Sequence, residues 1–477
     1  MVYLVSVTSY LLLLIGISVF FGFRVKTQED FMVAGRRLTW PILVGTLLAT
    51  WIGSGSIFGG GTLGFEQGFA ALWQPAGAWV GLLLIYFIAG RARRFGQFTV
   101  PDLMEERYNV AARVLATIAT ILSYAIIVSY QFRGGGIVLN LVLPDVTELE
   151  GILITAVFAT LFTAFAGLLS VAYTDIANGA IIVTSLVVAV PALARSAGGW
   201  AQVRAGLDAS HFSLMGTMSL QEALGFFLPT MFLLLGNANM YQRFFAARDE
   251  RHARLSVAGW VVGLLVVETL VIALAVIGSS MPRFAGLENH AHIIPTVARH
   301  GLPVAVGCLL LSAIAAIIVS TADSFLLVPA TNLVRDIYQR FVNPEASQSR
   351  IVWYSRGAVI LLGLVSFGMT QVHERILDAV VAAYTIYGAS ITPALLAIFL
   401  WRRATPAGGV ASILAGTAIG VGWEVWRFVG LGGEGFPLDI ETIYSSLLAS
   451  ILALIGVSLL TRPREAGAAD ATLAGGG

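Results

Sequence analysis

Long apolar runs recur along this chain, each close to the ~20 residues that a helix needs to cross a ~30 Å hydrocarbon core. Thirteen segments qualify, at residues 2–22, 40–61, 71–90, 112–139, 151–169, 172–194, 221–241, 256–280, 304–331, 353–371, 376–401, 408–428 and 441–461. Their lengths favour helices over β-barrel strands, which alternate in hydrophobicity over about ten residues. The first run has no basic stretch before it and no small-residue cleavage site, so we interpret it as a retained span. The sequence therefore predicts an all-α, multi-pass integral protein of the cell membrane, embedded in its lipid bilayer.

The composition supports this interpretation and narrows the possible partners. Apolar residues make up 57% of the chain and charged residues 12%, against ~25% charged residues in typical soluble proteins. So few charges could not cover a soluble surface of this size. The formal net charge of +1 predicts no nucleic-acid partner. The single cysteine excludes an intramolecular disulfide framework and a cysteine-based metal cluster.

The connections between the apolar runs are short, and none is long enough to form a soluble domain. We expect one transmembrane domain over residues 1–465, with its core at about 40–401, and a disordered cytoplasmic tail at 466–477 that is rich in Ala and Gly. No obligatory protein partner is evident. All six histidines lie in connections, so no buried Ser-His-Asp arrangement is available and we expect no catalytic residues.

The basic residues of the connections predict the orientation in the membrane. Connections at one end of the predicted bundle contain 21 of the 28 Lys and Arg residues, and those at the other end contain six. The remaining one, Arg133, lies inside the fourth span. Because basic residues concentrate on the cytoplasmic side, we expect the N-terminus outside and the C-terminus in the cytoplasm.

Two predicted spans contain residues that interrupt a membrane helix. The second contains the run Trp51-Ile52-Gly53-Ser54-Gly55-Ser56, and the seventh contains Pro229 and Gly236-Asn237. Glycine permits non-helical backbone and proline removes a backbone donor. Backbone groups freed in a bilayer must then find a ligand, water or protein partner. Interrupted helices at corresponding places in two five-helix halves are typical of inverted-repeat transporters, although small residues also allow close helix packing.

The ninth span contains the stretch Ser320-Thr321-Ala322-Asp323-Ser324, which places four oxygen-bearing side chains within five residues. Sodium is a hard cation, and hydroxyls with backbone carbonyls supply oxygen ligands without excess charge. Hydrogen bonds from hydroxyls to the preceding helical turn explain Ser320 and Thr321 individually. They do not explain Asp323, because a carboxylate within a membrane must be paired or functional.

Two further charged residues lie at or within predicted spans. Asp175 is at the start of the sixth span, where it either caps the helix or takes part in a site. Arg133 is about twenty residues into the fourth span. A guanidinium at that depth needs an anionic partner, which is Asp175, Asp323 or a substrate carboxylate.

Four stretches of the sequence resemble the sodium:solute symporter family. They are Asp30–Arg36, Ser170–Asp175, Tyr241–Arg243 and Ser320–Ser324, and the last is the most specific. The resemblance extends over nearly the whole chain. It implies thirteen helices and a leucine-transporter-type inverted repeat, with helices 2–6 and 7–11 forming a 5+5 core.

The resemblance also implies a principal sodium site, built from carbonyl groups of a broken helix and hydroxyl groups of an intact helix opposite it. The matching oxygen atoms belong to Ala49, Ile52, Ile317, Ser320 and Thr321. Some members have a second sodium site, which matches Asp175 and Ser324. This chain has Asp323 where those members have a serine, so Asp323 is a third candidate ligand of the possible second site, and the resemblance leaves the sodium stoichiometry open.

For the solute, the resemblance points to the broken second helix and the helices that face it. The expected solute contacts are Trp51, Gly53, Ser54, Ser56, Gln74, Arg133 and Asn237. Arg133 matches an arginine that sialic-acid members use for the substrate carboxylate, and Gln74 matches a polar contact on the third helix. Choline transporters are also similar around Trp51. Asn237 replaces a tryptophan of their cation-binding cage, however, which weakens a quaternary-ammonium interpretation.

These features together predict a sodium-coupled secondary active symporter. We expect it to take up a small polar organic solute, carboxylate-bearing or zwitterionic, by alternating access, with the sodium ion as its ionic partner. Inward movement of one charge supplies ~2.3 kcal/mol per 100 mV. The alternatives are a symporter for a choline- or betaine-like quaternary ammonium and a solute receptor that has lost transport.

Overall fold

The computed structural model describes residues 1–23, 27–96, 98–428 and 441–462. The tail predicted at 466–477 lies outside these ranges. Within them the chain is helical, and the β-structure consists of one isolated bridge between Leu38 and Ala247.

The α-helices are α1 (Val2–Gly22), α2 (Gln28–Val33), α3 (Trp40–Trp51), α4 (Gly60–Gln67), α5 (Trp73–Phe95), α6 (Val100–Arg107), α7 (Val110–Val142), α8 (Glu148–Ser196), α9 (Trp200–Ala205), α10 (Leu220–Gly236), α11 (Ala238–Ala246), α12 (Glu250–Ser279), α13 (Ile293–His300), α14 (Val304–Asn332), α15 (Gln348–Met369), α16 (Ile376–Leu400), α17 (Pro406–Phe428) and α18 (Thr442–Leu460). Short 3-10 or π-helical segments are η1 (Ala34–Arg36), η2 (Gly55–Gly59), η3 (Gly68–Leu72), η4 (Ala209–Phe212), η5 (Pro282–Phe284), η6 (His290–His292) and η7 (Leu333–Val342).

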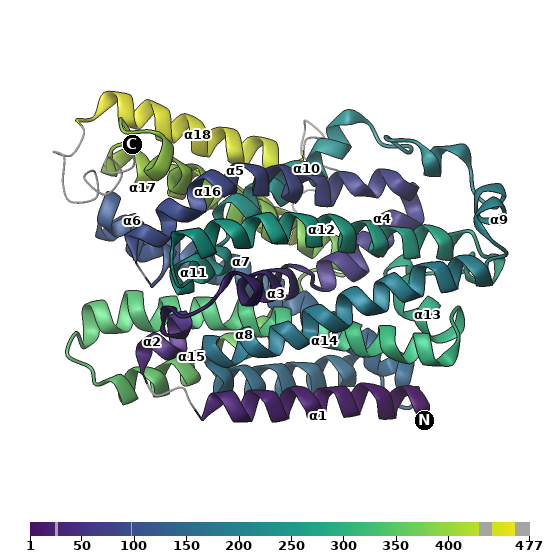
Figure 1. The fold of residues 1–477 in the computed structure, drawn as a ribbon. Helices are drawn as coiled ribbons and strands as arrows, with labels where there is room; N and C mark the ends of the chain where they lie inside the picture. Colours follow the sequence, from purple (N-terminus) through teal and green to yellow (C-terminus); the bar gives the residue numbers. More distant parts are fainter. Residues whose placement is uncertain (24–26, 97, 429–440, 463–477) are drawn as a thin grey trace.

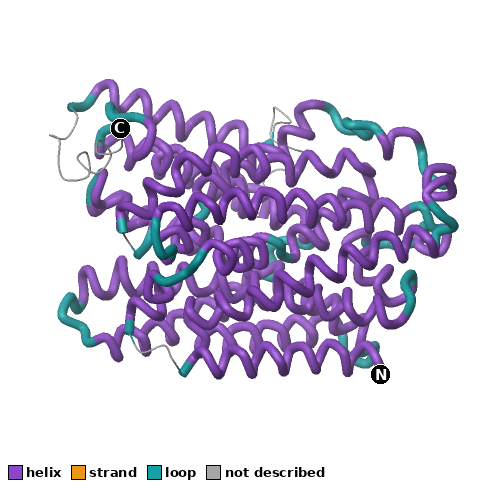
Figure 2. The backbone as a smooth tube through the Cα atoms, in the orientation of Figure 1, coloured by secondary structure: helices purple, strands orange, loops and turns teal. Residues whose placement is uncertain are grey.

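The long helices lie side by side in one bundle, with α1 near one side and α18 near the other (Figure 1). Loops and turns gather mostly at the two ends of this bundle (Figure 2). Eleven helices or helical stretches among the described residues are long and apolar enough to cross a membrane. Each of the thirteen apolar runs in the sequence lies on helical structure, either within one helix or across consecutive helical segments, and two of them share α8. The chain is therefore an all-helical polytopic membrane protein.

The longest helix, α8, accounts for two of the predicted spans. Its 49 residues would extend ~74 Å as a straight α-helix, more than twice the ~30 Å of a hydrocarbon core. The helix is kinked at Gly167, where φ is 70° and ψ is 164°. A side chain rarely adopts this positive φ, and a Cβ atom here would lie 2.8 Å from the ring of Phe31. Glycine is thus required where the two spans meet.

Both predicted helix interruptions are confirmed. Helix α3 ends at Trp51, and Ile52 is extended, with φ −70° and ψ 107°. The chain resumes through the π-helical segment η2 into α4. The second interruption separates α10 from α11 at Asn237, which has φ −56° and ψ 112°.

The connections rich in basic residues and those poor in them lie at opposite ends of the bundle. Helices α2, α6 and α11 mark one end, and α9 and α13 mark the other (Figure 1). This agrees with the alternation of spans on which the orientation was predicted. Arg243 is an exception to the count, because its side chain lies inside the bundle with 0% exposure instead of in a connection.

Candidate functional site

The first helix interruption is stabilised by polar side chains of two other helices. The backbone N–H of Ser54 donates to Oε1 of Gln131 on α7 at 2.8 Å. On α14, the hydroxyl of Thr321 donates to the carbonyl of Ile52 at 2.9 Å, and the hydroxyl oxygen of Ser320 lies 3.2 Å from the carbonyl oxygen of Ala49. The N–H of Ser54 and the carbonyl of Ile52, which the break releases, are therefore satisfied within the protein, as a bilayer requires.

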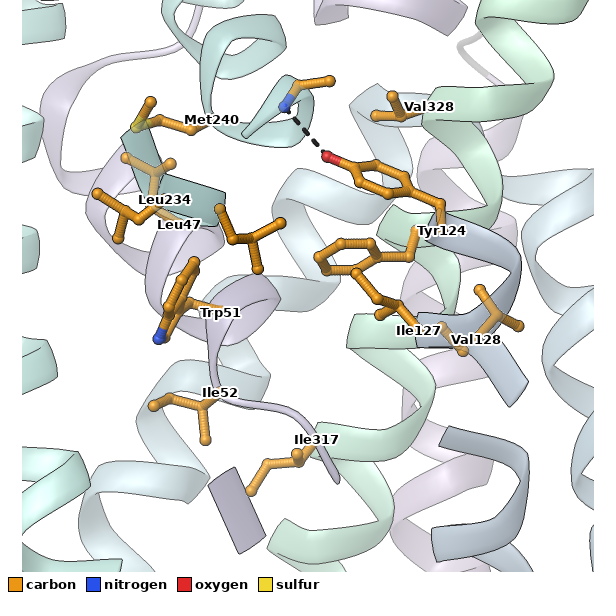
Figure 3. Close-up of a cluster of buried hydrophobic side chains, with 14 of the residues drawn as sticks. Leu47, Trp51, Ile52, Tyr124, Ile127, Val128, Leu234, Met240, Ile317 and Val328 are labelled. Carbon is orange, nitrogen blue, oxygen red and sulfur yellow. Dashed lines mark hydrogen bonds between the residues drawn. The ribbon is translucent and has the colours of Figure 1, made fainter. Parts of the chain in front are cut away.

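These contacts gather the oxygen atoms that the sequence assigned to the principal sodium site. Two carbonyl oxygens of the broken helix face two adjacent hydroxyls of an intact helix. Ile317, the fifth expected contributor, lies one turn earlier on α14 and next to Ile52 (Figure 3). All five residues are buried. Neutral oxygen atoms clustered in this way form a set of ligands suited to a hard cation.

The second interruption is satisfied by two tyrosines. The backbone N–H of Ala238 donates to the hydroxyl oxygens of Tyr124 and Tyr387, at 3.0 and 3.1 Å. The Tyr387 hydroxyl donates to the carbonyl of Gly236 at 2.8 Å. Asn237 accepts from the N–H of Met240 at 3.2 Å and so caps α11. Its oxygen also accepts from the Tyr124 hydroxyl at 3.4 Å, which gives the expected solute contact Asn237 a clear structural role.

Asp175 lies directly beside the cluster of candidate sodium ligands. Its carboxylate accepts from the hydroxyls of Ser320 and Thr46, each at 2.5 Å, and it forms an ion pair with Arg243 at 3.5 Å. Both charged side chains have 0% exposure. The predicted alternative of a helix cap is wrong, because α8 continues through this position from Gly167 and the carboxylate contacts other helices.

Arg243 also contacts the other residues matched to a second sodium site. Its guanidinium donates to Ser324 at 2.8 Å, to Thr50 at 2.5 Å and to Thr46 at 2.9 Å. It therefore lies among the oxygen atoms of Asp175 and Ser324, where a second cation would bind. From the sequence, Arg243 is a basic residue of a connection and the end of the Tyr241–Arg243 stretch that resembles the family, and neither feature predicts this contact.

Asp323, the third residue of the possible second site, faces a different partner. Its side chain is 1% exposed and accepts from the hydroxyl of Thr163 on α8 at 2.5 Å. Thr163 lies before the kink of α8, whereas Asp175 lies after it. Asp323 therefore contacts Thr163, whereas Asp175 and Ser324 contact Arg243. The three candidate ligands of the second sodium site do not share their partners.

Most of the expected solute contacts line or follow the first break. Trp51 ends α3 and lies beside aromatic rings, with its ring centroid 6.1 Å from that of Trp260 and 6.3 Å from that of Tyr384. A Cβ atom on Gly53 would lie 2.9 Å from the methyl group of Thr321, so the helices approach closely here. The Ser54 hydroxyl is buried and lacks a hydrogen-bond partner among the described residues. Gln74 is buried on α5, near Gly60.

A carboxylate that the sequence analysis did not single out contacts this segment. Glu268, in the middle of α12, accepts a hydrogen bond from the Ser56 hydroxyl at 2.8 Å and also interacts with Trp51. Its side chain is 4% exposed. The available signal was a single acid within the apolar run Val266–Leu270, the same signal that drew attention to Asp323.

Arg133 lies away from both candidate sodium sites. Its guanidinium donates to the carbonyls of Thr370 at 2.8 Å and Glu374 at 2.5 Å, both just beyond α15. Neither Asp175 nor Asp323 is its partner, contrary to one alternative from the sequence. Arg133 instead lines a cavity of about 610 Å³ at the end of the bundle. That cavity includes Thr62, which follows the broken segment on α4.

The amino-acid sequence is similar to those of known transporters. The model of the sodium:solute symporter family matches residues 31–416. The high affinity choline transporter 1 of Homo sapiens is 25% identical over 491 residues, which cover 94% of this chain and 84% of the transporter. A high-affinity proline transporter of Bacillus subtilis is 26% identical over 482 residues, which cover 94% of this chain and 96% of the transporter.

Solved structures share the arrangement of the helices. An outward-open, substrate-bound Na⁺-coupled sialic acid symporter superposes with a TM-score of 0.81 at 14% identity and covers 97% of this chain and 98% of its own. A nucleobase-cation-symport-1 family transporter superposes with a TM-score of 0.63 at 12% identity, with 93% and 97% coverage. At such identities the likeness shows the fold alone, which is of the leucine-transporter type.

Proposed function

This chain belongs to the sodium:solute symporter family, and on that premise we propose that it couples sodium entry to the uptake of a small polar organic solute by alternating access. Membership makes it a multi-pass membrane transporter and not an enzyme. The family is sodium-coupled, so sodium is a co-transported substrate here and not a resident cofactor.

One observation carries the proposed sodium site. The adjacent hydroxyls of Ser320 and Thr321 meet the carbonyls of Ala49 and Ile52 at the broken end of α3, at 3.2 and 2.9 Å. In our proposal a sodium ion replaces these hydrogen bonds and takes these four oxygens, with the Ile317 carbonyl, as ligands. Asp175 supplies a negative charge one hydroxyl away, since it accepts from Ser320.

We further propose that one sodium ion accompanies each solute molecule. The second site expected at Asp175 and Ser324 already has a cation beside it, the guanidinium of Arg243. A sodium ion there would face that charge at close range and would have to displace its hydrogen bonds to Thr50 and Ser324. In this proposal the guanidinium of Arg243 supplies the positive charge beside Asp175 and Ser324 that a second sodium ion supplies in some members.

The proposed solute site lies at the first break and extends to the second, since Trp51 and Asn237 line one small pocket. Its residues are Trp51, Gly53, Ser54, Ser56, Gln74 and Asn237. A zwitterion suits this segment. The Ser54 hydroxyl, which has no partner among the described residues, can donate to its carboxylate, and the carboxylate of Glu268 beside Ser56 can face its positive charge. Arg133 lines the cavity at the end of the bundle, so we propose that it contacts the solute during entry and not in the central site.

The proposed topology follows from the same premise. The thirteen predicted spans cross the bilayer as a single transmembrane domain, with the N-terminus outside. Helices 2–6 and 7–11 form two inverted halves, and the two helix interruptions occupy corresponding places in them. The opposite placement of basic-rich and basic-poor connections supports this arrangement.

The test is uptake by proteoliposomes under an inward sodium gradient, with choline, betaine, L-proline and sialic acid as the first solutes. Ser320→Ala and Thr321→Ala each remove one of about five oxygen ligands, so each should raise the sodium concentration for half-maximal uptake. Ser412→Ala is the matched control, because its buried hydroxyl pairs with Ser450 between α17 and α18. Unchanged sodium dependence in both test variants would rule out this site. Sodium-dependent solute binding without uptake would indicate a receptor.

A further inference from the structure

Glu268 is a buried acid without a cationic partner. It lies on α12 with 4% exposure, and its partners in the part of the chain that the structure describes are the Ser56 hydroxyl and the Trp51 side chain. Asp175, which is equally buried, is paired with Arg243. An ionised carboxylate within a membrane bundle is costly unless a cation compensates it. A cationic group bound beside Glu268 would supply the compensation that no described side chain provides.

The surroundings of Glu268 suit an organic cation better than a bare ion. Trp51 contacts the carboxylate, and its ring lies 6.3 Å from that of Tyr384 and 6.1 Å from that of Trp260. Tyr384 is close enough to Glu268 to interact with it electrostatically. Aromatic faces attract cations through their quadrupole, most strongly where water is excluded. They are poor ligands for sodium, which prefers oxygen.

Two side chains beside Glu268 are only partly buried. Ser56 belongs to η2, just past the interruption, and both it and Tyr384 remain partly accessible inside the bundle. Thr62, six residues further on, lines the cavity of about 610 Å³. Six helical residues span roughly 9 Å. Ser56, the partner of Glu268, is therefore separated from a residue of the cavity by a short stretch of helix.

The cavity that Thr62 lines has an excess of acidic side chains. Its lining includes two guanidinium groups, those of Arg133 and Arg375, against four carboxylates, which belong to Glu66, Glu148, Glu288 and Glu374. Clefts lined by one sign of charge concentrate the opposite sign near them. A cavity with this excess therefore favours cations over anions.

We propose that Glu268 recognises a cationic nitrogen of the transported solute, an ammonium group that lies between this carboxylate and the aromatic faces of Trp51 and Tyr384. The inference rests on the proposed function, because it assumes that a solute binds at the broken helix. It narrows the substrate class to amines, quaternary ammonium compounds and zwitterions. It excludes solutes whose only charge is a carboxylate.

The first test compares ligands on the wild-type protein. Thermal stability of the purified protein in sodium is measured with three ammonium probes: choline, L-proline and tetramethylammonium. Choline is matched with dimethylbutanol, its uncharged carbon isostere, and proline with tetrahydrofuran carboxylate, in which oxygen replaces the charged nitrogen. We expect stabilisation by at least one ammonium probe and none by the matched isosteres.

The second test changes the carboxylate. Glu268→Gln keeps the size and the ability to accept from Ser56 but removes the charge. A close pair of opposite charges in a desolvated site contributes about tenfold or more in affinity, so the half-stabilising concentration of the ammonium probe should rise by at least that factor. Glu268→Asp keeps the charge at a shorter reach and should lose less. Glu424→Gln, a half-buried acid on α17 paired with Arg427, is the matched control and should bind as the wild type does.

The outcomes test the role of Glu268 and the proposed sodium-coupled function separately. Unchanged probe binding in Glu268→Gln, equal stabilisation by the isosteres, or no stabilisation by any ammonium probe would each overturn the role of Glu268. Stabilisation of the ligand-free wild type by sodium over potassium tests the sodium site separately. If sodium does not stabilise the wild type, the proposed function is wrong. If sodium still stabilises Glu268→Gln while the ammonium probe no longer binds, the result supports both the proposed function and the role of Glu268.

Discussion

Replacement of Arg243 by methionine tests the buried ion pair next to the proposed sodium site. The guanidinium of Arg243 lies 3.5 Å from Asp175, and both side chains are fully buried. Methionine fills a similar volume without charge, so the change removes the electrostatics and four hydrogen bonds with little loss of packing. The acceptors left behind are Thr46, Thr50, Ser324 and the carbonyl of Asn239.

The structure sets the expected size of the effect. Removal of one member of a buried ion pair costs about 3–5 kcal/mol, because the remaining charge is uncompensated. Asp175 keeps its bonds from Ser320 and Thr46, which favours the lower end of that range. Asp323 is close enough to repel Asp175, which favours the upper end. Asp175→Asn should cost a similar amount, since it leaves the guanidinium of Arg243 unpaired.

The double variant separates this explanation from a general loss of packing. Asp175→Asn combined with Arg243→Met removes both charges and should recover at least about 2 kcal/mol relative to the sum of the single changes. The single cysteine, Cys308, is buried, so a thiol-reactive dye reports unfolding on heating. A double variant that is as unstable as the sum of the two singles would refute the ion-pair argument.

Sodium dependence provides a second measurement on the same variants. In Arg243→Met the oxygens of Asp175, Ser324 and Thr50 lose their cation, and sodium becomes the available replacement. We expect sodium to stabilise this variant more strongly and with a steeper concentration dependence than the wild type, while potassium does not. An unchanged dependence would contradict the proposal that Arg243 takes the place of a second sodium ion.

Two glycine substitutions test the backbone geometry. Gly53→Ala places a Cβ atom 2.9 Å from the methyl group of Thr321, so it should weaken sodium stabilisation several-fold while the bundle still folds; unaltered sodium affinity would argue against a tight fit at the break. Gly167→Ala forces a side chain onto a φ of 70° beside Phe31 and should cost about 1–3 kcal/mol, read as a lower melting temperature. Its control is Gly456→Ala within α18, where no heavy atom lies within 4 Å of the added Cβ; an equal effect at both positions would contradict the strain argument.

The helices and their interruptions were accessible from the sequence because local chemistry determines them. Apolar runs of membrane length specify the spans, and glycine, proline and asparagine within them specify the breaks. The adjacent hydroxyls of Ser320 and Thr321 were recognisable for the same reason. Their oxygen atoms stand out in a membrane-spanning segment, where side chains are expected to be mostly apolar.

The partners of buried charges were not accessible, because they depend on how helices pack. Arg243 follows the second break by six residues, and only the direction of α11 brings it inward to Asp175. The partners of Arg133 were not accessible for a related reason. Its neighbours on α7 lie at the first break, because Gln131 accepts from the N–H of Ser54 and Gly134 packs against the Ser54 hydroxyl. The long Arg133 side chain extends from there to the carbonyls of Thr370 and Glu374, and only the packing of the helices determines that contact.

A shared broken helix also accounts for how sodium and solute could be coupled. The proposed sodium ligands Ala49 and Ile52 precede the break, and Ser56, which contacts Glu268, follows it within a few residues. An ion that fixes the carbonyls of Ala49 and Ile52 thereby restricts the position of Ser56. Linkage is reciprocal, so the factor by which sodium strengthens solute binding must equal the factor by which solute strengthens sodium binding. If the break is the physical connection, Gly53→Ala should reduce this common factor, measured as a smaller effect of sodium on the half-stabilising concentration of the solute.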